Sequence, residues 1–258
     1  MLFFRSATIL IVCCAIGGRA LLTRAATTNL KRQLLFRGVV NLLAWLSYYS
    51  AAKTLPLAQL LCLYFAAPLM VTVMARQILK ENVTASRWLS VGIGFIGVLF
   101  ASDPFGVSAS PATLLVLIAA ALWGYGAILM RQIAHHDAAT MLQMVSVNGV
   151  FFFATGALCM AHWQPLTSSQ IAMLIGVGIL GGIAQFLVFE TIRLIQASVM
   201  ATVEYSALPW AFMLGYLIWH DIPPLPVFLG AGLIFVAGAI LVHAERRAAI
   251  VTIRDHGV

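Results

Sequence analysis

The stretch SSQIAMLIGVGILGGIAQFLVF, residues 168–189, contains no charged side chain. A helix needs about 20 predominantly apolar residues to cross the hydrocarbon core of a bilayer, so this stretch predicts a membrane-spanning helix. Its apolar residues are continuous and do not alternate with polar ones, which excludes a strand of a transmembrane β-barrel. The stretch therefore indicates an all-α membrane protein.

Similar apolar runs lie on both sides of this stretch, and each ends at a charge, a proline or a polar loop. We expect nine transmembrane helices, over residues 2–22, 34–52, 56–78, 86–102, 111–131, 139–161, 168–189, 197–219 and 225–243. Short loops join them, so the sequence predicts one polytopic helix bundle without a soluble module.

The composition agrees with a membrane protein. Of the 258 residues, 62% are hydrophobic and 9% are charged, against about 45–50% and about 25% in soluble domains, and the mean hydropathy is +0.99. The net charge of +7 comes from single or paired basic residues at the ends of apolar runs, which argues against a nucleic-acid partner. The four cysteines lack metal-ligand spacing, so we expect no metal and no cofactor.

The basic residues also predict the orientation. If the first helix enters from outside, all Lys and Arg residues except Arg5 and Lys53 fall on the cytoplasmic side. The positive-inside rule then places the C-terminus in the cytoplasm, in a multi-pass protein of the cytoplasmic membrane. An alternative makes the apolar start a signal peptide, but the basic residues between Arg19 and Arg37 oppose it.

An internal repeat links the two halves of the chain. Residues 64–68, YFAAP, recur as YSALP at 205–209, and the same offset of 141 maps Gly97 onto Gly238. The two copies would cross the membrane in opposite directions, as in the inverted repeats of many secondary transporters.

The offset also predicts the domains. Residues 1–103 form a first repeat that lacks its first helix, residues 111–245 form a second, and residues 246–258 form a cytoplasmic tail. Either the chain starts one helix late, or the protein works with nine helices in a 4+5 arrangement.

Several motifs in order resemble the drug/metabolite transporter superfamily, specifically its EamA-type carriers. They are LFFR (2–5), Arg37, YYSAAKTLPLAQ (48–59), Pro68, Lys80-Glu81, GIGFIGVL (92–99) and Glu204-Tyr205-Ser206. The resemblance implies a ten-helix carrier of small organic metabolites with a central cavity that opens alternately to the two sides. It is closer to the branch that includes riboflavin, S-adenosylmethionine and opine-metallophore carriers.

This chain departs from the family pattern in three ways. The first helix is absent, Gln59 stands where an acidic residue is frequent, and His220-Asp221 replaces the second Gly-Glu pair.

Glu204 lies about seven residues into the predicted helix 197–219, where a carboxylate costs about 2.5–3.5 kcal/mol on insertion scales unless it is paired, protonated or hydrated. Ala201, Ala207 and Ala211 share its helical face, which a cavity or a close helix contact would suit. We expect Glu204 to couple transport to protons or to bind a cationic group of the substrate. The alternative is a structural carboxylate that is hydrogen-bonded to a neighbouring helix.

Tyr64 and Tyr205 occupy equivalent repeat positions, each four residues before a proline, Pro68 or Pro209. A proline inside a membrane helix leaves a backbone carbonyl without its donor and bends the helix. Paired bends at matching places suit a binding site between two repeats. They are also compatible with kinks that serve packing alone.

Arg5 stands near the outer end of the first predicted helix. It either extends to the lipid headgroups or binds an anionic group, as the family resemblance favours. Gln59 and Trp210 are further polar or aromatic residues inside predicted helices, and we take them as candidates to line the cavity. Others of this kind are Tyr48, Trp123, Asn148 and Gln185.

The spacing of Gly92, Gly94 and Gly97 matches the GxGxxG pattern of dinucleotide sites. Such a site needs a preceding strand and an opening helix. Here the glycines lie inside an apolar run, so they predict close helix packing instead.

Together these features predict a secondary transporter that moves a small organic metabolite by alternating access. The sequence has no Walker-type ATP motif, so a proton or substrate gradient would drive it, and we favour export over uptake. The expected partners are the substrate and the lipid bilayer, and the sequence leaves a homodimer open. The alternatives are a non-transporting remnant or regulatory membrane subunit and, less favoured, an intramembrane enzyme, for which no catalytic constellation is evident.

Overall fold

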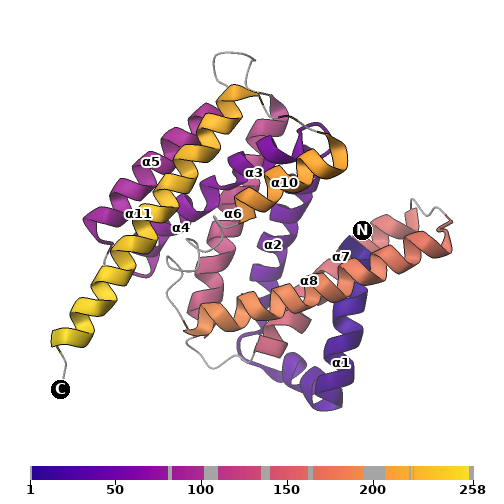
Figure 1. The fold of residues 1–258 in the computed structure, drawn as a ribbon. Coiled ribbons are helices and arrows are strands. Elements are labelled where there is room, and N and C mark those ends of the chain that lie inside the picture. Colours follow the sequence, from indigo (N-terminus) through magenta and orange to yellow (C-terminus); the bar gives the residue numbers. More distant parts are fainter. Residues whose placement is uncertain are drawn as a thin grey trace. The chain divides into compact units, whose positions relative to one another are not determined.

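The computed structural model describes residues 2–80, 83–101, 110–134, 140–161, 165–194, 207–220, 222 and 224–255, and within them it contains helices and no strand (Figure 1). The helices are α1 (Leu2–Thr27), α2 (Lys31–Ala51), α3 (Leu57–Tyr64), α4 (Ala66–Ile78), α5 (Ala85–Ala101), α6 (Pro111–Ala134), α7 (Thr140–Ala161), α8 (Ser168–Leu194), α10 (Ala207–Trp219) and α11 (Leu225–Asp255). The all-α fold is confirmed.

Each of the nine predicted membrane helices has a helical counterpart in this structure, with α3 and α4 together forming the third. Six described segments are long and apolar enough to cross a membrane: Leu2–Thr27, Gln59–Ile78, Pro111–Ile133, Thr140–Met160, Ser168–Thr191 and Leu225–Ala244. The first residues of the predicted helix 197–219 lie outside the described residues. The chain is therefore a multi-pass membrane protein.

The third segment is broken between α3 and α4, at Phe65. Pro68 lies in the first turn of α4 and has no backbone N–H, so it cannot donate to the Tyr64 carbonyl four residues earlier. Phe65 itself closes α3 by donating to the Leu61 carbonyl at 2.9 Å. The residues that follow stay helical as far as Ile78.

Helix α1 contains a kink that the sequence analysis did not predict. Gly18 has φ 58° and ψ −161°, which no helix residue adopts. This region of backbone space is open essentially only to glycine. The first membrane helix is therefore two helical pieces joined at Gly18.

The chain divides into two compact units. Unit 1 comprises Met1–Leu42 and Leu129–Ile195, and unit 2 comprises Leu43–Ile128 and Gln196–Val258. In unit 1, α1 packs against α7 and α8, and in unit 2, α5 packs against α11 and α3 packs against α10. Each unit thus combines helices from both halves of the sequence.

The contact between α5 and α11 in unit 2 brings two backbones close together, and Figure 1 shows the two helices running side by side. A Cβ atom added to Gly97 would lie 2.7 Å from the carbonyl oxygen of Gly230 and 2.9 Å from Cγ1 of Ile234. Gly94 similarly faces Leu69 of α4. The interpretation as helix-packing residues is confirmed for Gly94 and Gly97, whereas an added Cβ on Gly92 meets no atom within 4 Å.

Candidate functional site

A buried arginine, Arg37 of α2, forms the centre of a polar cluster in unit 1. Its side chain is 2% exposed. Nη1 donates a hydrogen bond to Oε1 of Gln143 at 3.1 Å, and Nη2 lies 3.2 Å from the Met130 sulfur. The guanidinium carbon lies 4.6 Å from the centre of the Phe189 ring. An amide, a thioether and an aromatic face therefore surround the charge.

These neighbours carry no negative charge. An arginine side chain stays protonated in proteins, and a buried charge is costly unless it is paired and hydrogen-bonded. Among the described residues, the structure places no carboxylate against the Arg37 guanidinium. Within the part of the chain that the structure describes, the positive charge of Arg37 is therefore not balanced.

A second polar pair, Asn148 and Gln185, lies in the same unit. Asn148 is fully buried, and its Nδ2 donates to the Met144 carbonyl at 2.9 Å and to Oε1 of Gln185 at 3.3 Å. Gln185 and Phe189 are four residues apart on α8, so the two polar groups lie about one helical turn apart. We call Arg37, Met130, Gln143, Asn148, Gln185 and Phe189 the Arg37 cluster.

Three buried polar atoms of this cluster lack a hydrogen-bond partner among the described residues. They are Nε of Arg37, Nε2 of Gln143 and Oδ1 of Asn148. Two of them are donors and one is an acceptor. Buried polar groups are nearly always hydrogen-bonded in native structures, so atoms of this kind need an explanation.

Arg5 of α1 also contacts α8. Its Cδ lies 3.4 Å from the position that a Cβ on Gly181 would take. Gly181 precedes Gln185 by one turn, so Arg5 and the Arg37 cluster contact the same side of α8. The contact places the Arg5 stem against α8, and it is compatible with both predicted roles of this residue.

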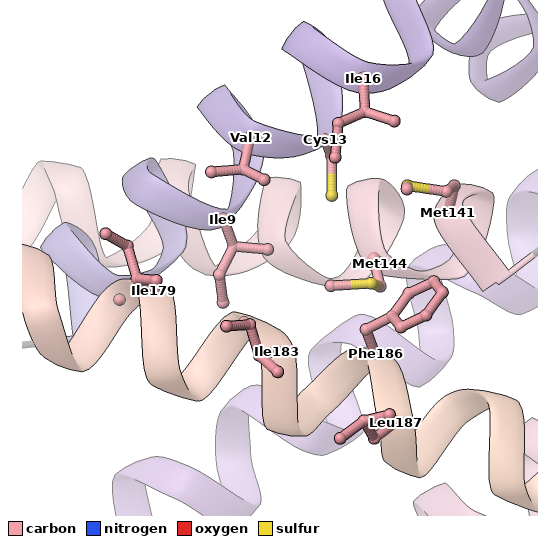
Figure 2. Close-up of a pocket in the computed structure, with 12 residues that line it drawn as sticks. Ile9, Val12, Cys13, Ile16, Met141, Met144, Ile179, Ile183, Phe186 and Leu187 are labelled. Atoms are coloured by element: carbon pink, nitrogen blue, oxygen red, sulfur yellow. The ribbon is translucent and has the colours of Figure 1, made fainter.

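An apolar pocket of about 360 Å³ lies among α1, α7 and α8 of unit 1. Figure 2 shows Ile9, Val12, Cys13 and Ile16 of α1 facing Met141 and Met144 of α7 and Ile179, Ile183, Phe186 and Leu187 of α8. Apart from the Cys13 thiol, these side chains offer no hydrogen-bonding group. The pocket suits an apolar group, such as a ring or an acyl chain.

The other predicted site residues that the structure describes belong to unit 2. The Tyr64 ring packs edge-on against Tyr48, with 5.1 Å between the ring centres. Helix α3, which carries Gln59 and Tyr64, packs against α10, which carries Trp210. Gln59 is half-buried, whereas Trp210 is 62% exposed.

The remaining predicted residues are less fully described. Pro209 is the third described residue of α10. Glu204 and Tyr205 lie outside the described residues. Pro68 is buried at the start of α4.

Arg37 supported the predicted orientation and the family resemblance, and was not predicted as a site residue. The signal was present, because Arg37 follows Leu34, Leu35 and Phe36 inside a predicted membrane helix. As with Glu204, a charge inside a membrane helix is a candidate functional residue. Gln143, four residues into its helix, was missed because an amide gives a weaker signal than a charge.

Comparisons with known proteins show one family and several individual relatives. The model of the EamA-like transporter family matches residues 1–102 and 110–243. A riboflavin transporter of Vibrio cholerae is 25% identical over 213 residues, which cover 82% of this chain and 70% of the relative. An S-adenosylmethionine uptake transporter of Rickettsia prowazekii is 24% identical, over 82% of this chain and 72% of its own.

Two further similarities cover more of the chain. The pseudopaline exporter CntI of Pseudomonas aeruginosa is 26% identical over 95% of this chain and 86% of its own length. A solved structure, described only as a protein crystal structure, superimposes with a TM-score of 0.68 at 18% identity, covering 95% of this chain and 88% of that one. At that identity the superposition shows the fold alone.

Proposed function

Because the chain belongs to the EamA-like transporter family, we propose that it moves a small organic metabolite across the cytoplasmic membrane as a secondary carrier. The observation that carries this proposal is the family match along both halves of the chain. Relatives named as carriers of riboflavin, S-adenosylmethionine and pseudopaline support a substrate of this class, an organic metabolite with several polar groups.

We propose that transport proceeds by alternating access between two inverted repeats, residues 1–103 and 111–245. Packing inside the units supports this arrangement. Shifting α1 by 141 residues gives 143–168, which overlaps most of α7, and shifting α5 gives 226–242, which lies within α11. Both pairs pack together. A helix that contacts its own repeat counterpart is expected where a two-fold axis in the membrane plane relates the repeats.

We propose Glu204 as the residue that couples transport to protons or binds a cationic substrate group. Tyr64, Tyr205, Trp210, Gln59 and Arg5 are the proposed cavity residues, and Pro68 and Pro209 the proposed bends. The break between α3 and α4 beside Pro68 supports the bend in the first repeat.

The energy source and direction complete the proposal. Without an ATP motif in the sequence, a proton or substrate gradient drives the carrier, and we favour export. The metabolite crosses chemically unchanged. A compound that is converted in cells expressing this chain would instead indicate an enzyme.

The test compares metabolites inside and outside cells that express the wild-type chain, Glu204→Gln or Glu190→Gln at matched levels. We expect one compound class to redistribute with the wild type and with Glu190→Gln, and at least tenfold less with Glu204→Gln. Glu190 is the matched control because it is a described carboxylate near the end of α8. If the wild type redistributes no compound, the result favours a non-transporting or regulatory membrane protein.

A further inference from the structure

The Arg37 cluster holds a positive charge that the described part of unit 1 does not balance. Arg37 is 2% exposed, and its contacts are the Gln143 amide, the Met130 sulfur and the Phe189 ring. The amide is a dipole, the sulfur is a weak acceptor and the ring is a quadrupole. None of the three carries a full negative charge. A charged side chain within membrane helices is by default a functional residue.

The free edge of the guanidinium has the geometry of an anion site. Nε and Nη2 form one side of the planar group, the side that binds a carboxylate or phosphate through two parallel hydrogen bonds. Nε lacks a partner among the described residues, and Nη2 contacts only the thioether of Met130. An anion that displaced the sulfur would gain both hydrogen bonds without breaking the bond from Nη1 to Gln143.

The neighbouring amides extend this edge. Gln143 turns Oε1 toward Arg37, so its Nε2 donors point elsewhere and lack a partner among the described residues. Asn148 uses Nδ2 for two hydrogen bonds and leaves its buried Oδ1 without one. The cluster thus offers donors for an oxyanion and, about one turn along α8, an acceptor for an N–H or O–H group.

We infer that the Arg37 cluster binds an anionic group of the transported substrate, a carboxylate or a phosphate, through the Nε and Nη2 edge of Arg37 and the amide of Gln143. The inference rests on the proposed function, because the anion belongs to the metabolite that the carrier moves.

The first test measures binding without transport. The full chain is purified in detergent, and its thermal unfolding midpoint is compared in inorganic phosphate, in acetate and in chloride at equal ionic strength. For the wild type and for Arg32→Gln, we expect one of the two oxyanions to raise the midpoint by about 2–4 °C over chloride. Arg32 is the matched control, an exposed arginine on the same helix. A rise in phosphate indicates a phosphate site, and a rise in acetate indicates a carboxylate site.

Two variants test whether the response to the oxyanion depends on the Arg37 cluster. Arg37→Gln removes the charge, and Gln143→Glu places a carboxylate where the structure has an amide oxygen 3.1 Å from Nη1. We expect neither variant to respond to the oxyanions, and we expect Gln143→Glu to unfold above the wild type in chloride. A wild type that does not respond, or an Arg37→Gln protein that responds equally, would overturn the inference.

The second test separates this inference from the proposed function. We expect the metabolites whose redistribution depends on Arg37 to carry a carboxylate or a phosphate. Arg37→Gln should redistribute them at least tenfold less, while Arg32→Gln does so normally. If Arg37→Gln transports them normally, the inference is wrong and the carrier function stands. If the wild type transports nothing, the carrier function fails, and the thermal comparison alone decides whether the cluster binds an anion.

Discussion

Lys80 and His220 hold left-handed backbone angles, with φ of 55° and 54°. Lys80 follows Leu79, the C-cap of α4, and His220 follows α10 directly. Both side chains are exposed. A side chain in this region costs about 1–2 kcal/mol, a cost that glycine does not have. We expect Lys80→Gly and His220→Gly each to raise the free energy of unfolding by about 0.5–1 kcal/mol, measured as a higher thermal midpoint.

Gln77→Gly is the control for this prediction, because Gln77 is an exposed residue inside α4. Glycine in a helix interior should lower stability by about 0.5–1 kcal/mol. If all three variants lower the midpoint alike, the left-handed angles do not strain the backbone. The sequence analysis had already marked His220 as a departure from a family glycine, and the backbone angle at this residue gives that departure a physical meaning.

For single residues of the site, the sequence predicts which ones matter but not what they contact. A charge in an apolar run is visible in the sequence, and Glu204 and Arg37 both have this signal. Whether such a charge has a partner depends on which helices face it, as Arg37 of α2 faces α7 and α8 across sequence separations of 106 residues and more. The sequence therefore predicts that such a residue matters, but not what it contacts.

Helix α1 gives a test at the scale of the element. Because Gly18 has angles open essentially only to glycine, Gly18→Ala should destabilise the protein by about 1–3 kcal/mol. Gly176→Ala on α8 is the control, since no atom lies within 4 Å of its added Cβ and its φ is ordinary. That change should be neutral or stabilising by up to about 1 kcal/mol. Equal thermal midpoints for the two variants would show that the kink is not required.

The contact between α5 and α11 gives a second test. A Cβ at position 97 would meet the Gly230 carbonyl oxygen at 2.7 Å, and backbone does not move aside easily. We expect Gly97→Ala to lower the free energy of unfolding by about 1–3 kcal/mol. Gly92→Ala on the same helix meets nothing within 4 Å and should leave the thermal midpoint unchanged or slightly higher. The opposite order would mean that the helices do not approach at Gly97.

Helix starts were the most predictable part of the fold. Apolar length determines a membrane helix almost alone, so the described starts, that of α10 apart, lie within a few residues of the predicted positions. The ends were less predictable, since α11 runs to Asp255, through most of the predicted tail 246–258. The break beside Pro68 has a chemical cause in the sequence, a missing N–H. The kink at Gly18 was not predicted, because a glycine in a helix is common and only tertiary packing selects its unusual angles.

The orientation of the whole molecule is a prediction that labelling can check. Lys53 and Arg32 are both exposed, and the basic residues place them on opposite sides of the membrane. In intact cells, a membrane-impermeant maleimide should label Lys53→Cys and should label Arg32→Cys only after permeabilisation. The unsubstituted chain is the background control, with Cys13 and Cys62 buried. Reversed labelling would mean that the chain is inserted the other way.

The unbalanced charge at Arg37 has an electrical consequence for the transport cycle. With a singly charged anion bound, the site is neutral, and with nothing bound it carries one positive charge. A membrane voltage does work only on net charge, about 2.3 kcal/mol for each charge moved across 100 mV. If the cluster binds the transported anion as we propose, the charge of Arg37 adds no electrical work to the loaded step, while the same charge makes the return of the empty site respond to voltage. For this one charge, the membrane potential would act on the resetting of the carrier and not on the loaded step.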